Sequence, residues 1–86
     1  MTKKNDIPEQ RTLVAIDISK HRNDVLIQPP GRKRYRMAIT NDRVDHDRLI
    51  EHLVGLEGSV SVGLEATGDY HRAIAWRLLS AGFTYI

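Results

Sequence analysis

The segment that most constrains the fold is a short apolar run, residues 13–18, which Asp17 interrupts once. A nearly continuous apolar run of this length is typical of a central β-strand that is covered on both faces. The run therefore predicts a central strand, and the carboxylate of Asp17 inside it requires an explanation.

A proline-glycine turn at residues 29–31 separates two further segments with strand patterns. Proline presets the backbone for the first central position of a turn, and glycine tolerates the positive φ of the second. The segments on either side, 23–28 and 34–39, are therefore predicted to pair as an antiparallel hairpin.

Two helices are predicted from capping residues and helical spacing of apolar residues. Asn41 or Asp42 can cap a helix that ends at Gly55, and Thr67 can cap a second helix that ends at Gly82. The order of elements is β-β-β-α-β-α-β, an α/β fold with a mixed sheet in which the first, fourth and fifth strands run parallel. The predicted strands are 13–18, 23–28, 34–39, 60–65 and 83–86.

Residues 1–11 are polar and contain Pro8, which predicts a disordered lead before a domain at residues 12–86. A last strand ending at Ile86 would leave an apolar sheet edge uncovered, so we expect the N-terminal part of a longer domain, truncated after that strand. No run approaches the roughly 20 apolar residues of a membrane span. The chain has no cysteine, which excludes thiolate metal sites. We expect a cytoplasmic protein with no membrane partner.

Basic residues are concentrated in the first part of the chain. Residues 1–40 contain nine Lys/Arg against four Asp/Glu, and residues 41–86 contain four against seven. A basic segment favours a polyanionic partner, and the alternative is a solvated surface. Four cations surround the predicted hairpin turn, where they either bind a nucleic-acid backbone or keep an edge strand soluble. These four are Arg32, Lys33, Arg34 and Arg36.

Asp17 and Glu65 are predicted at the C-terminal ends of neighbouring parallel strands, where open α/β sheets place their ligands. Asp17 shares its face with Ala15, and Glu65 shares its face with Ser61 and Gly63, so small neighbours leave room for a substrate. Two close carboxylates favour a cation between them, and hard oxygen ligands select Mg²⁺ or Mn²⁺. On these two residues alone, a structural role at the strand ends is the alternative.

Two local sequences carry a resemblance to a known family. Asp17 lies in Val-Ala-Ile-Asp-Ile-Ser-Lys, and Glu65 lies in Gly-Leu-Glu-Ala-Thr-Gly-Asp-Tyr. Together with the element order and the Leu-Leu-Ser-Ala-Gly-Phe segment at 78–83, they resemble the DEDD transposases of bacterial insertion sequences, the insertion-sequence-110 family. The resemblance covers residues 13–86.

The resemblance implies a ribonuclease-H-like (RuvC-like) domain in which four acidic residues bind divalent metal. Asp17 would be the first and Glu65 the second, both as catalytic ligands of Mg²⁺ or Mn²⁺. Ala15 and Asp69 stand where glycine is common in the family. The third and fourth acidic residues and the family's serine-bearing C-terminal domain are absent from the sequence. We therefore expect this chain to be inactive alone.

The resemblance also implies partners. DNA would be the substrate, some members use a structured guide RNA, and the full-length protein would be a homo-oligomer. By the family pattern, Lys20 is expected to contact a phosphate.

Residues near the two carboxylates have smaller predicted roles. Thr67 is expected to cap the second helix, Gly68 to let the backbone turn close to the site, and Tyr70 to pack into the core. The four histidines show no metal-ligand spacing and are expected on the surface: His21, His46, His52 and His71.

Other protein classes share parts of this pattern. Sugar kinases and actin-like ATPases need a glycine-rich turn after the first-strand aspartate, and residues 18–22 contain no glycine. A RuvC-type junction resolvase is closer in chemistry, and a non-catalytic remnant that binds nucleic acid is the alternative from another class.

Overall fold

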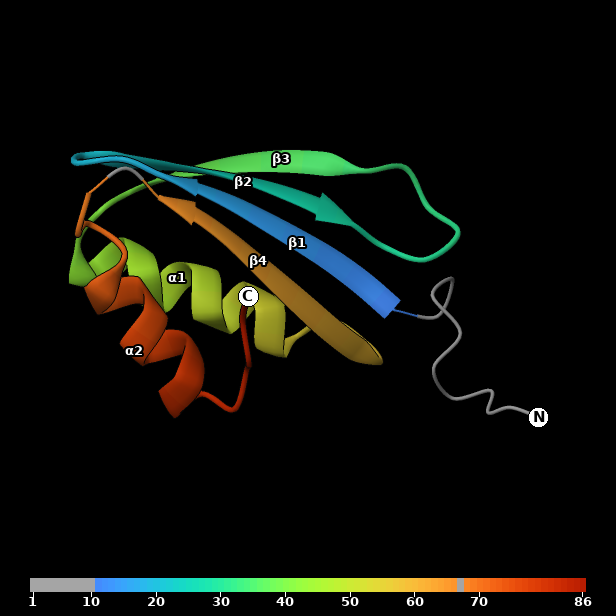
Figure 1. Cartoon of the computed structure of the whole chain (residues 1–86). Helices are drawn as coiled ribbons and strands as arrows, with labels where there is room; N and C mark the ends of the chain where they lie inside the picture. Colours follow the sequence, from blue (N-terminus) through green and yellow to red (C-terminus); the bar gives the residue numbers. More distant parts are fainter. Residues whose placement is uncertain (1–10, 67) are drawn as a thin grey trace.

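The computed structural model describes residues 11–66 and 68–86, which form four strands and two helices (Figure 1). Most of the predicted disordered lead, residues 1–10, lies outside the described residues, as does Thr67. In chain order the elements are β1 (Arg11–Ile18), β2 (Arg22–Gln28), β3 (Tyr35–Thr40), α1 (Arg43–Val54), β4 (Ser59–Ala66) and α2 (Arg72–Ser80).

The described strands form one mixed sheet in the order β3-β2-β1-β4. β2 pairs antiparallel with both β1 and β3, whereas β1 and β4 run parallel. Gly31 has a φ of 66° in the turn between β2 and β3, a value that glycine adopts without steric cost. The predicted hairpin, the parallel pair and the central position of β1 are therefore confirmed.

Both helices pack on one face of this sheet (Figure 1). In β1, Thr12, Val14, Ile16 and Ile18 are buried on that face, and the residues between them are exposed. Leu13 is 48% exposed on the opposite face. The expectation that β1 is covered on both faces is therefore wrong for the described chain, because neither α1 nor α2 reaches the second face, here called the open face.

The helices contribute apolar side chains at helical spacing to one core. Leu49 and Leu53 of α1 and Ile74 and Leu78 of α2 are almost completely buried against the strands. Burying such a side chain contributes roughly 1.5–3 kcal/mol relative to leaving it exposed. The fold is therefore held mainly by one layer of helices on one face of the sheet.

Hydrogen bonds fix the corner between β3 and α1. The side chain of Asp42 accepts from the backbone N–H of Asp45 at 3.0 Å, which caps the first turn of α1. The carboxylate of Asp45 accepts from the backbone N–H of Thr40 at 2.7 Å and from its hydroxyl at 2.8 Å. These bonds lower the pKa of Asp45 to about 2, because they stabilise its charged form. Gly55 occupies the C-cap position of α1, as predicted.

The predicted fifth strand is reduced to a single parallel bridge between Tyr85 and Val62 of β4. Backbone bonds of 3.1 Å and 2.8 Å join Ile86 to Val62 and to Leu64. The preceding residues do not extend this pairing because the N–H of Phe83 donates to the carbonyl of Leu78, at the end of α2. The direction of the fifth segment is as predicted, but its extent is not.

The boundaries of β2, β3 and β4 differ from prediction by one residue at one or both ends, and those of β1 and α2 differ by more. β1 includes Arg11, which was assigned to the lead, because Arg11 pairs with Ser59 at the start of β4. α2 begins at Arg72 rather than directly after Thr67, because residues 68–71 form a turn. Neither of the described helices is long and apolar enough to cross a membrane.

Candidate active site

Three carboxylates lie in one row across the open face. Asp17 is paired with Glu65 in the parallel ladder of β1 and β4, and with Asp24 in the antiparallel ladder of β1 and β2. Side chains of paired residues point to the same face of a sheet, and all three are exposed on the face opposite the helices. We call Asp24, Asp17 and Glu65 the acidic row.

The acidic row borders an open hollow of about 620 Å³. Ala15 and Gly63 line this hollow beside the carboxylates, as strand parity predicted. A Cβ atom built on Gly63 would have its nearest contact, the carbonyl oxygen of Val14, at 4.0 Å. Packing therefore does not require glycine at this position, and the small side chains leave space in front of the acidic row.

Asp24 was not among the residues predicted from the sequence. It forms an ion pair with Arg22, with 3.0 Å between Nε and Oδ1 and with both side chains more than half exposed. An exposed pair of this kind contributes about 0–1 kcal/mol. The hairpin register could have revealed Asp24, because a short turn after Ile18 places it directly opposite Asp17.

The acidic row offers part of a divalent-metal site. Mg²⁺ is usually held by one or two carboxylates, with water and substrate phosphates as its other ligands. Asp17 and Glu65 provide hard oxygen donors from adjacent strands. Within residues 11–66 and 68–86, no group of three or more histidine or acidic side chains is arranged to hold a metal ion. Two carboxylates therefore fit such an ion only when other ligands complete its shell.

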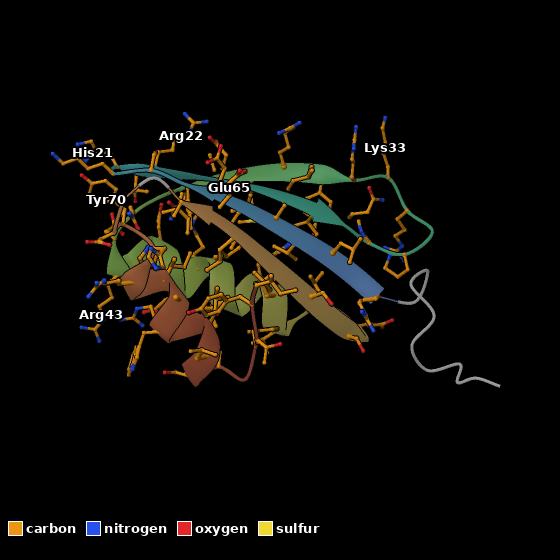
Figure 2. All side chains as sticks on the ribbon, in the orientation of Figure 1. His21, Arg22, Lys33, Arg43, Glu65 and Tyr70 are labelled. Carbon is orange, nitrogen blue, oxygen red and sulfur yellow. The ribbon has the colours of Figure 1, made fainter. Side chains whose placement is uncertain are left out.

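The predicted basic residues separate into two locations. Lys20 lies exposed in the turn after β1, and Arg36 lines the hollow from β3. The other three lie in the turn after β2. This turn is far from Asp17, because the end of β2 pairs with the start of β1. Figure 2 shows Lys33 at this end of the sheet, and His21 and Tyr70 at the opposite end. The cations placed away from the acidic row are Arg32, Lys33 and Arg34.

The residues after Glu65 differ from expectation in one respect. Gly68 has a φ of 71°, which places a backbone turn after β4. Tyr70 was expected in the core, but it is 41% exposed in the turn before α2. Its carbonyl oxygen instead accepts a hydrogen bond from the side-chain nitrogen of Asn41 at 3.2 Å. The predicted cap, Thr67, lies outside the described residues.

A buried polar cluster lies beneath the turns that follow β1 and β4. Asn23 is 0% exposed, His46 is 1% exposed, and both contact the side chain of Asn41. The Nε2 atom of His46 lies 2.8 Å from Oδ1 of Asn41, and the Nδ2 atom of Asn23 lies 3.4 Å from it. We call these three residues the Asn41 cluster. Sequence analysis assigned none of them to the site.

The expectation that His46 lies on the surface is wrong. His46 precedes Leu49 and Leu53 at helical spacing, and these three residues are the buried residues of α1. Burial lowers the pKa of His46, and the positive charge of Arg77 lowers it further. Both effects favour the neutral form of the imidazole. The helical spacing of His46 to Leu49 was the sequence signal for its burial.

Comparison with known proteins agrees with the two motifs. Residues 14–86 match the sequence model of the insertion-sequence-110 type of DEDD transposase, which is described as a transposase. The matched segment contains Asp17, Glu65 and all of the hollow that they border. No curated protein matches the chain. Because the family model spans most of the sequence, the chain belongs to the insertion-sequence-110 family of DEDD transposases.

Proposed function

We propose that this chain supplies the first two metal-binding carboxylates of a transposase that cleaves and joins DNA strands. Asp17 and Glu65 are the proposed ligands, and Mg²⁺ or Mn²⁺ is the proposed ion. The observation that carries the proposal is the direct pairing of Asp17 with Glu65 on the open face, beside a hollow lined by small residues. Family membership supports the same reaction class.

The proposed fold is ribonuclease-H-like. Three antiparallel strands lead into a parallel partner for β1, and Tyr85 adds a parallel bridge on the outer side of β4. This arrangement supports the assignment because it brings the ends of β1 and β4 to one edge of the sheet, where open α/β sheets bind ligands.

Four side chains have a proposed role in binding the metal ion or the DNA backbone. A bound divalent ion supplies Lewis-acid activation for phosphodiester chemistry. Asp17 and Glu65 hold that ion on the open face. Arg36 and Lys20 bind the phosphates of the DNA backbone, because one lines the hollow and the other lies in the turn after β1. Three cations would contact only DNA that extends past the far end of the sheet: Arg32, Lys33 and Arg34.

The partners follow from the family. DNA is the proposed substrate, and a structured guide RNA and further copies of the protein are the proposed partners. Bacterial DNA lies in the cytoplasm, which is the proposed place of action. Since the tetrad needs two further acidic residues, we propose that this chain alone holds metal but does not cut DNA.

The proposal is tested by titrating the ¹⁵N-labelled chain with Mn²⁺ and following paramagnetic broadening of its amide signals. Signals of Asp17 and Glu65 should broaden along one binding curve. Asp17→Asn and Glu65→Gln should each weaken binding by at least the roughly 10- to 100-fold that outer-shell changes cause. Glu57→Gln is the matched control, because Glu57 is an exposed carboxylate outside the hollow.

The same titration distinguishes the alternative function. Equal Mn²⁺ affinity in wild type, Asp17→Asn and Glu65→Gln would reject a metal site at these residues. The chain would then be better described as a non-catalytic module of a transposase, with its cations as the functional groups.

A further inference from the structure

Asn41 joins the two turns that follow the proposed metal ligands. Its side-chain nitrogen donates to the carbonyl oxygens of Ser19 at 3.0 Å, Lys20 at 3.4 Å and Tyr70 at 3.2 Å. Its backbone N–H also donates to the carbonyl oxygen of His21 at 2.9 Å. One residue therefore contacts three successive carbonyls after β1 and one carbonyl after β4.

The identity of these acceptors fixes the orientation of the Asn41 amide. Carbonyl oxygens only accept hydrogen bonds, so the atom that faces three of them must be the NH₂ group. The other side of the amide, Oδ1, then faces His46 Nε2 and Asn23 Nδ2 and accepts from both. Two buried side chains therefore donate to Oδ1 of Asn41, and its NH₂ group donates to carbonyl oxygens in the two turns.

The neutral state of His46 agrees with this orientation. Nε2 must carry the proton in order to donate to Asn41, and Nδ1 is buried without a partner among the described atoms. A second proton on Nδ1 would be left unsatisfied, at the cost of a buried donor. His46 therefore acts as a fixed N–H donor that prevents the Asn41 amide from rotating.

Strand ends are the parts of a sheet that open most easily, and both ligands lie near such ends. Asp17 is the residue before the last of β1, and Glu65 is the residue before the last of β4. The side chain of Asn41 bonds to the turn after β1 and to the turn after β4. These bonds therefore limit the opening of both strand ends. Contacts behind metal ligands fix the orientation of those ligands, and their loss typically weakens metal binding or activity.

We propose that Asn41 is a positioning residue for the metal centre. It holds the ends of β1 and β4 in one arrangement, so that Asp17 and Glu65 present their carboxylates to the same ion. Asn23 and His46 hold the amide in the orientation that this role needs. The inference rests on the proposed function, since it assumes that the two carboxylates share a metal ion.

The test measures Mn²⁺ affinity by amide broadening in Asn41→Ala and Asn41→Ser. The serine variant keeps one donor that can bond to one turn but not to both, and it remains polar if the alanine variant fails to fold. Both should weaken Mn²⁺ binding by about tenfold or more, and broadening at Asp17 and Glu65 should no longer follow one curve.

Leu53→Ala is the matched control for lost stability. Leu53 is 1% exposed at the far end of α1 and lines a pocket with residues at the start of β4, distant from Glu65. After correction for the unfolded fraction, measured by urea titration, its Mn²⁺ affinity should stay within about twofold of wild type.

The outcomes separate the two proposals. If wild type binds Mn²⁺ through Asp17 and Glu65 but the folded Asn41 variants bind it equally well, the positioning role is wrong and the metal site stands. The positioning role is also wrong if Leu53→Ala loses as much affinity as Asn41→Ser, because general stability then explains both. If wild type shows no binding that depends on Asp17, the proposed function itself fails, and this inference fails with it.

Discussion

Asp17 and Asp24 lie directly opposite each other in the antiparallel ladder of β1 and β2, so two negative charges face each other on the open side of the sheet. Like charges in such a pair destabilise a sheet, and Arg22 offsets part of the repulsion through its ion pair with Asp24. The open face therefore carries an unfavourable pair of like charges, and one of the two residues is the proposed metal ligand Asp17.

The first prediction concerns this charge pair in metal-free buffer of low ionic strength. Asp17→Asn should raise the free energy of unfolding, and the gain should be smaller when Asp24→Asn is already present. The coupling should be about 0.2–1 kcal/mol, the range for cross-strand pairs. Urea unfolding of the four proteins measures the coupling, and the lost bond from Arg22 to Asp24 cancels because Asp24→Asn removes it in both backgrounds. A coupling of zero would show that solvent screens the pair completely.

The second prediction concerns pH. The folded-state pKa of His46 lies below its ordinary value, so the unfolded chain takes up a proton first as pH falls below about 6.5. The stability contributed by neutral His46 is fully present above that pH and decreases below it, by at most about 1.4 kcal/mol per pH unit. Urea unfolding between pH 7.5 and 5 should show this slope.

His46→Gln should remove the His46 part of that slope, since glutamine does not titrate. His21→Gln is the control, because His21 is exposed in the turn after β1. The interpretation is wrong if the His21 variant loses the slope and the His46 variant retains it.

The third prediction concerns DNA binding. Arg36 lines the hollow, whereas Arg34 belongs to the turn at the other end of the sheet. Arg36→Ala should therefore reduce the slope of log affinity against log salt by about 0.9, the value for one lost phosphate contact on duplex DNA. Arg34→Ala should leave the slope unchanged. Fluorescence anisotropy at several salt concentrations compares them, and the opposite ranking would move the DNA path to the hairpin turn.

The fourth prediction concerns activity. With Mg²⁺ or Mn²⁺, the 86-residue chain should leave a supercoiled plasmid intact, because two carboxylates of a tetrad do not complete a two-metal centre. An agarose gel distinguishes nicked from supercoiled plasmid. Nicking by wild type that disappears in Asp17→Asn would show that the 86-residue chain is sufficient for catalysis.

Local patterns predicted the parts of the fold that depend on nearby residues. The apolar run around Asp17 placed β1 at the centre of the sheet, and strand parity placed Ala15 and Gly63 beside the carboxylates. Pairing of neighbouring strands then brought Asp17 and Glu65 together. These predictions succeeded because side-chain alternation and strand order follow directly from the sequence.

Three features were not predicted, and one of them, the role of Asn41, depends on contacts between segments distant in sequence. Asn41 was considered only as a helix cap, whereas its side chain bonds to turns that are distant in sequence. His46 was expected on the surface because the four histidines show no metal-ligand spacing, although its spacing to Leu49 and Leu53 places it on the buried face of α1. Phe83 was assigned to a strand, but its N–H bonds to the end of α2. The Asn41 bonds join segments distant in sequence, whereas the errors at His46 and Phe83 concern contacts within or at the end of one helix.

The pairing that places Glu65 beside Asp17 has a consequence for the order of folding. Asp24 meets Asp17 through a short hairpin, which closes quickly, whereas Glu65 arrives only after β3 and α1 have been added to the chain. Contacts between distant parts of a chain form later than local ones because a longer loop must close first. During synthesis Glu65 therefore reaches Asp17 only after the residues of β3 and α1 have been made. The proposed pair of metal ligands is therefore assembled late, and a half-made chain carries Asp17 without Glu65.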